Sequence, residues 1–110
     1  MAQYAVFLYE RVPPADLPPE VMQRHIDMPE RAAELGGRIV AGMALEPPET
    51  ATAIRDGELI DGPFLETKEV LGGVFVIEAR DLDHALAIAK LTPTVDGGVE
   101  VVPLIDFQVL

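Results

Sequence analysis

The sequence predicts an α+β fold of the ferredoxin-like β-α-β-β-α-β order, with one antiparallel sheet and an extra β-hairpin. Runs of β-forming residues alternate with two amphipathic helical patterns along the chain. An Asp-Gly pair between two short strand-like runs indicates the hairpin. A length of 110 residues, with no repeat, linker or low-complexity segment, leads us to expect a single domain over residues 1–110.

The first half of the chain predicts a strand, a helix and a second strand. Residues 3–9 are rich in β-forming side chains, and the loop that follows contains four prolines, which exclude regular structure there. A helix is expected over residues 20–35, where Pro29 should kink or split it. A Gly-Gly pair ends this helix, and residues 38–45 are expected to form the second strand.

The hairpin and a long strand follow. Residues 51–55 and 58–61 flank the Asp-Gly pair, and this arrangement would place Arg55 opposite Glu58. Residues 70–79 form a nearly unbroken apolar run, which is typical of a strand buried on both faces. Two glycines near the start of that run permit a β-bulge or a close backbone approach.

The last part of the chain predicts a helix and a final strand. Asp81 is expected to cap a helix over residues 82–91, which carries Leu and Ala at helical spacing. A turn over residues 96–98 then leads to a strand over residues 99–109. Because two helices cover only one face of a sheet, an apolar second face predicts pairing with a second copy of the chain.

Composition excludes several classes of function. The formal net charge is −11, and the few Lys and Arg residues are scattered, so nucleic acid and anionic membranes are poor candidates as partners. The absence of cysteine removes disulfides, thiol catalysis and Cys-based zinc sites, and it fits a cytoplasmic location. We expect no signal peptide, because residues 1–9 have no basic region and a charge follows at Glu10. We expect no membrane span, because no apolar run approaches the required length.

One motif carries a family resemblance. The run Asp-Gly-Pro-Phe-Leu-Glu-Thr-Lys-Glu over residues 61–69, followed by Leu-Gly-Gly over residues 71–73, resembles the signature of the DGPF group within the YCII-related proteins. Further matching stretches extend the likeness from about residue 33 to about residue 103. The resemblance therefore covers most of the chain.

The resemblance implies a dimeric α+β barrel, in which two ferredoxin-like sheets pack face to face, but it implies no firm activity. The fold is similar to that of muconolactone isomerases and antibiotic-synthesis monooxygenases. Some relatives accompany sigma factors, which suggests a regulatory protein partner. A His on the first helix and an acidic residue are proposed as a catalytic pair in such proteins, and His25 matches that position. Met43 stands where many relatives have Glu.

His25 is the leading candidate for chemistry. On a helix it shares a face with Met22 and Met28, so it could act as a general base in an apolar cleft near neutral pH. The alternative is a surface or half-buried histidine with one hydrogen bond. His84, in the first turn of the second helix, is expected to face solvent.

The other candidates surround the Asp-Gly-Pro-Phe turn. Asp61 could be a catalytic carboxylate at a pocket mouth or a simple turn residue, and Glu66 could be an acid or a solvated charge. Phe64 and Lys68 are candidate ligand contacts, as is Met43, and Phe64 is expected to be largely buried. We expect His25 to lie near the 61–66 segment. A metal site built from His25, Asp61 and Glu66 has no ligand spacing to support it, so no metal is expected.

Two interpretations of function stay open. The first is a dimeric module that binds a small molecule or a regulatory protein. The second is a cofactor-free enzyme that moves protons on a small cyclic or aromatic-derived acid, with His25 as the base and Asp61 or Glu66 as the acid. The geometry around His25 discriminates between them.

Overall fold

The protein is described here by a computed structural model that covers residues 1–65 and 70–110. The α+β order expected from the sequence is confirmed. Short 3-10 turns, η1 and η2, precede α1 and β3 respectively. The elements are β1 (Ala2–Glu10), η1 (Pro14–Asp16), α1 (Pro19–Glu34), β2 (Arg38–Ala44), η2 (Pro48–Thr50), β3 (Thr52–Arg55), β4 (Glu58–Asp61), β5 (Leu71–Ala79), α2 (Leu82–Ala89) and β6 (Gly97–Pro103).

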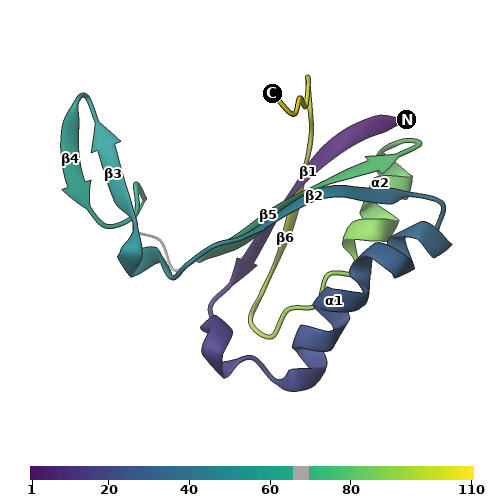
Figure 1. Cartoon of the computed structure of the whole chain (residues 1–110), viewed down its shortest axis with the longest axis horizontal. Coiled ribbons are helices and arrows are strands. Elements are labelled where there is room, and N and C mark those ends of the chain that lie inside the picture. The colour runs from purple at the N-terminus through teal and green to yellow at the C-terminus, as the bar shows by residue number, and fades with distance from the viewer. Residues whose placement is uncertain (66–69) are drawn as a thin grey trace.

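Four strands form the main sheet, in the order β2-β5-β1-β6, and all neighbouring strands are antiparallel. This is the strand order of a ferredoxin-like fold, with both helices on one face of the sheet (Figure 1). The expected bulge lies at Gly72, because Leu8 pairs with Gly73 while the next residue, Tyr9, pairs with Leu71. The bulge lies at the end of the sheet where the candidate site is built.

The core lies between the helices and the two central strands. Val6 on β1 and Ile77 on β5 have no exposed surface, and they pack with Ala32 of α1 and with Ala85 and Ile88 of α2. Small side chains on the helices let them approach the sheet closely, while the β-branched side chains of the strands fill the space. Around Val6 and Ile77, the helix-facing side of the sheet is thus close-packed.

The opposite face of the sheet has no helix over it (Figure 1). Ala5 and Phe7 on β1 and Val76 on β5 alternate with the core residues, so their side chains point to this uncovered face. At its edge, Arg38 and Glu78 form an ion pair with an N–O distance of 3.5 Å. The uncovered face therefore has an apolar centre and a charged margin.

The Asp-Gly hairpin is present, with Arg55 opposite Glu58 as expected. Asp56 and Gly57 both have positive φ angles, of 52° and 82°, which is the geometry of a type I′ turn. However, β3 and β4 form a separate two-stranded sheet that reaches away from the main one, so the expectation of one sheet is wrong (Figure 1). The Pro-Pro step that opens η2 breaks the path from β2, because proline cannot continue a ladder.

Several details of the elements differ from the sequence-based expectations. Pro29 does not split α1, which runs unbroken through it. Gly97 lies in β6 rather than in a turn, because a Cβ there would overlap the carbonyl of Tyr9 and only glycine allows this approach. Pairing of β6 with β1 ends at Pro103, so the strand expected to reach residue 109 stops there.

Across residues 1–65 and 70–110, no helix is both long and apolar enough to traverse a bilayer.

His84 is buried, so the expectation that it faces solvent is wrong. Its Nε2 lies 2.7 Å from the carbonyl oxygen of Leu35, and its Nδ1 accepts a hydrogen bond from the backbone N–H of Arg80 at 3.0 Å. Asp81 caps α2 as expected, since its side chain accepts the backbone N–H of His84 at 2.8 Å. His84 therefore joins the start of α2 to the end of α1 and serves the fold.

The packing of α2 against the sheet predicts a contrast between two isoleucines. Ile88 has no exposed surface, whereas Ile54 on the hairpin is 65% exposed. We expect Ile88→Ala to lower the free energy of unfolding by about 2–5 kcal/mol through lost burial and the cavity left behind. Ile54→Ala is the matched control and should cost far less. Urea unfolding measures both, and equal losses would contradict this core assignment.

Candidate functional site

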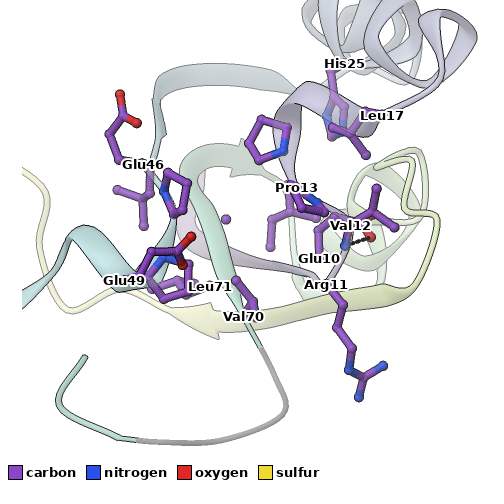
Figure 2. Close-up of a pocket in the computed structure, with 16 residues that line it drawn as sticks. Glu10, Arg11, Val12, Pro13, Leu17, His25, Glu46, Glu49, Val70 and Leu71 are labelled. Atoms are coloured by element: carbon purple, nitrogen blue, oxygen red, sulfur yellow. Dashed lines mark hydrogen bonds between the residues drawn. The ribbon is translucent and has the colours of Figure 1, made fainter. Parts of the chain in front are cut away.

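Two adjoining hollows lie on the helix side of the sheet, beside the first half of α1. The smaller has a volume of about 180 Å³ and lies near the end of β1 and the start of β5 (Figure 2). The larger has a volume of about 390 Å³ and extends along β2 and β5. His25, Leu8, Leu17 and Gly72 line both hollows. His25 thus stands where the two spaces meet.

The larger hollow is apolar apart from one side chain. Met22 and Met28 of α1 line it on one side, and Ile39 and Phe75 of the sheet line it on the other. Among the described residues that form its wall, His25 is the one with an ionisable side chain. Apolar walls with a single polar group are typical of sites for small organic molecules.

Gly42 keeps the floor of this hollow open. A Cβ at this position would lie 3.8 Å from the Cβ of Phe75 and near no other atom. The space above Gly42 is therefore vacant, because Gly42 has no side chain and no neighbouring side chain fills the space. A Cβ here would make only an ordinary van der Waals contact, and a longer side chain would extend from it into the hollow.

Glu10 is the most buried of the ionisable residues that line the smaller hollow. Glu10 is only 8% exposed, and its carboxylate has three hydrogen-bond donors within the protein. It accepts hydrogen bonds from the backbone N–H groups of Val12 at 3.2 Å, Val95 at 2.6 Å and Asp96 at 2.9 Å. A buried carboxylate held by several amide donors is a stable, charged group despite its burial.

The electrostatics of Glu10 follow from these contacts. Burial raises the pKa of its carboxyl, but the three backbone hydrogen bonds and the nearby His25 lower it, and the pKa ends below the ordinary value of 4.5. Glu10 is therefore ionised at neutral pH. It places a fixed negative charge below the hollow that His25 overlooks.

His25 lies half-buried on α1, and its ring points into the hollow beside Leu17 (Figure 2). Burial lowers the pKa of His25 from 6.5, and the charge of Glu10 offsets this only in part. Within residues 1–65 and 70–110, no hydrogen bond occupies either ring nitrogen, in contrast to His84. At neutral pH His25 is thus an uncharged imidazole with both nitrogens available to a ligand.

Further carboxylates set the charge of the smaller hollow. Glu46 and Glu49 line it together with Glu10. Arg11 also lines it, but its guanidinium forms an ion pair with Asp96 at 2.9 Å and points away from the hollow (Figure 2). This arrangement disfavours an anionic ligand. Among the described residues, no group of three or more acidic, His or Cys side chains is placed to hold a metal ion.

The structure brings together only part of the set expected from the sequence. His25 and Met43 line the same hollow. Asp61 is exposed at the end of β4, opposite Thr52, and lines neither hollow, so the expectation that it lies near His25 is wrong. The hairpin that carries Asp61 diverges from the main sheet, which separates it from α1 (Figure 1).

Phe64 is 54% exposed in this single chain, so it is not the core residue that the sequence suggested. Its ring lies under the guanidinium of Arg55, which is 3.9 Å from the ring centre. It lines a third hollow, between the hairpin and the main sheet, that does not include His25. Glu66 and Lys68 lie outside the described residues.

Sequence reasoning missed Glu10. The local signal is a glutamate that directly follows the apolar run of residues 3–9. The second signal was Gly97, whose close approach to Tyr9 brings the amides of Val95 and Asp96 onto the carboxylate. These residues lie about eighty-five positions after Glu10, so a local pattern does not join them.

Glu10 predicts a specific loss of stability in acid. Its pKa is lower in the folded protein than in the unfolded chain, so its stabilising effect is complete above the unfolded pKa and disappears as pH falls through the folded pKa. Between about pH 7 and pH 3, wild-type stability should therefore fall more steeply than that of Glu10→Gln. Urea midpoints at each pH measure this.

The exposed Glu30 of α1 provides a control, because Glu30→Gln should keep the wild-type pH profile. If Glu10→Gln also follows the wild-type profile, the carboxylate is not held as described.

Comparison with known proteins agrees with this architecture. The family model of the YCII-related domain matches residues 2–108, which is nearly the whole chain. No curated protein sequence matches the chain. The match includes both helices, all the strands and the two residues, Glu10 and His25, at the centre of the site. The chain therefore belongs to the YCII-related domain family.

Proposed function

We propose that this protein binds a small, neutral, mainly apolar molecule in the larger hollow, and that His25 holds the polar group of that molecule. One observation carries this proposal: an uncharged imidazole without a hydrogen bond to any described residue is the ionisable group of an otherwise apolar wall. Hydroxyl, enol and carbonyl groups all suit it, since an imidazole both accepts and donates. The carboxylates of Glu10, Glu46 and Glu49, which line the adjoining smaller hollow, argue against the cyclic acid considered from the sequence.

A second function is favoured by the pairing of His25 with Glu10. An uncharged histidine can remove a proton from a hydroxyl, or from a carbon beside a carbonyl, and the charge of Glu10 would stabilise the imidazolium that forms. Because Asp61 lies elsewhere, His25 itself would return the proton to another atom of the same molecule. The product would be an isomer, and no other reactant would be needed.

We also propose that two copies pair through the uncovered face of the main sheet. The apolar centre, which includes Ala5, Phe7 and Val76, and the charged margin at Arg38 and Glu78 match the core and rim of a protein interface. A standard interface of this kind buries about 1,600 Å² in total. The helices of both copies would then lie on the outside of the pair. The two hollows of each copy would lie on this outer, helix-covered side of its sheet.

The binding proposal predicts the effect of filling the hollow. Gly42→Leu should weaken binding of small lactones, enones and phenols by roughly tenfold or more, because its side chain would occupy the site. Binding is followed by the NMR resonances of the His25 ring, with His84 as an internal reference. Gly98→Ala is the matched control, since a Cβ there meets nothing within 4 Å and Gly98 lines neither hollow.

If no compound in the panel shifts the His25 resonances, the binding site is assigned wrongly. For any compound that binds, deuterium uptake from D₂O distinguishes the two functions. Uptake that His25→Gln abolishes indicates proton transfer, and binding without uptake indicates a binding module only.

The pairing proposal predicts the effect of a charge on the uncovered face. Phe7→Glu should convert a dimer into a monomer, since a buried unpaired carboxylate is costly. Leu59→Glu on the hairpin, where Leu59 is 75% exposed, should leave the dimer intact. Analytical ultracentrifugation measures both. A wild-type protein that sediments as a monomer at micromolar concentration would contradict the pairing.

A further inference from the structure

A further hollow, of about 500 Å³, is lined by α1 and by the loop that follows α2. It shares no lining residue with the two hollows that contain His25. Arg24 and Arg31 of α1 line it together with Lys90 at the end of α2, and Thr92 and Thr94 of the loop add hydroxyl groups. Figure 1 shows this loop on the face of the sheet where both helices lie. Three cationic side chains from two helices therefore line one space.

The charge of this cationic hollow is opposite to that of the whole protein. The chain has a formal net charge of −11 and 8 Lys and Arg residues, and three of these eight line this one hollow. Among the described residues of its wall, no side chain is acidic. Cations that only keep a surface solvated are normally interspersed with acidic side chains. The cationic hollow is therefore a local positive field on an acidic protein.

The fold does not neutralise these three charges. Within residues 1–65 and 70–110, Arg24, Arg31 and Lys90 form no ion pair. Asp27 has the helical spacing to pair with either arginine, at i+3 from the first and i−4 from the second. Its carboxylate instead accepts a hydrogen bond from Nε2 of Gln23 at 2.9 Å. All three cations are thus available to a ligand.

Thr92 supplies an independent observation. Its hydroxyl is the one buried side-chain polar atom, in the part of the chain that the structure describes, without a hydrogen-bond partner. Native folds keep few such groups because each is costly, and an ion or water from outside the chain accounts for many of them. Because this oxygen is buried, the side chain would turn about its Cα–Cβ bond to present the hydroxyl to the cationic hollow.

The loop that carries the two threonines is held at both of its ends. At its start, the backbone N–H of Thr92 donates to the carbonyl of Ala89 at 3.0 Å. Directly after Thr94, the amide of Val95 donates to the carboxylate of Glu10 at 2.6 Å. A wall that is ordered before the ligand arrives lowers the entropic cost of binding. This side of the cationic hollow is therefore preorganised.

We propose that the cationic hollow binds a small anion that carries a diphosphate group. Arginine matches phosphate oxygens with two parallel N–H donors, whereas lysine acts as a point charge. Arg24 and Arg31 lie about 10 Å apart along the axis of α1, and their long side chains can converge on two linked phosphates from that separation. The net charge of −11 would repel a long polyanion such as nucleic acid. This site is separate from that of His25, so it does not depend on the function proposed above.

A titration of the full chain with inorganic pyrophosphate tests the proposal, with the backbone amide resonances of Thr92 and Thr94 as the readout. Both resonances should shift and saturate. Pyrophosphate should bind at least about tenfold more tightly than inorganic phosphate, because its second phosphate group engages the second arginine. Citrate is the third probe, and citrate binding as tight as that of pyrophosphate would show that the phosphate assignment is wrong. A pyrophosphate titration without saturable shifts would overturn the site itself.

Variants identify the groups that bind. Arg24→Gln combined with Arg31→Gln should weaken pyrophosphate binding by about tenfold or more. The matched control, Arg38→Gln combined with Arg80→Gln, removes the same charge from exposed residues outside the cationic hollow and should leave binding unchanged. Equal weakening in both double variants would mean that the anion responds only to overall charge, and would contradict the proposal.

Thr92→Val gives a second test that keeps the shape of the side chain. It should weaken pyrophosphate binding, as followed at the amide of Thr94, because the hydroxyl donor is lost. Its urea midpoint should not fall below that of the wild type, since the hydroxyl that it removes has no partner among the described residues. Unchanged pyrophosphate binding would remove Thr92 from the site, and a lower urea midpoint would show that the hydroxyl serves the fold instead.

Discussion

The three hydrogen bonds to the carboxylate of Glu10 determine how one end of this fold is built. They tie the end of β1, the loop that leads to α1, and the turn before β6 to a single point. All three donors are backbone amides, so the charge and the amides satisfy one another. Gly97 makes this possible, because any side chain there would collide with β1. The loop that carries α1 into position is anchored by the same contact.

The chemistry of the site follows from the same charge. A carboxylate with three amide donors stays ionised although it is nearly buried. His25 lies half-buried near Glu10, and this burial lowers the pKa of the imidazole and keeps it uncharged at neutral pH. Glu10 and His25 together therefore suit proton transfer. Glu10 would stabilise a proton that binds to His25, and the uncharged ring leaves both of its nitrogens available to a ligand. An isolated surface histidine has no neighbouring carboxylate to stabilise its imidazolium.

The sequence predicted the elements better than the contacts between them. Asp56-Gly57 and the Asp81 cap act within a few residues, so local rules identified the hairpin and α2 correctly. Glu10 and His84 were missed because their partners lie far away in the chain or on another helix. The final strand was predicted too long because its alternating pattern continues to Val109 while its neighbour in the same chain ends. A sequence pattern indicates which side chains are apolar enough to be buried, and only the fold shows which elements cover them.

The central claim is that Glu10 and His25 form one electrostatic unit, and the pKa of His25 tests it most directly. An NMR titration of the ring in the wild type should give a pKa below 6.5, since burial outweighs the charge of Glu10. In Glu10→Gln the pKa of His25 should fall further, because the charge of Glu10, which raises it, is gone. A pKa that stays the same or rises in that variant would contradict the claim.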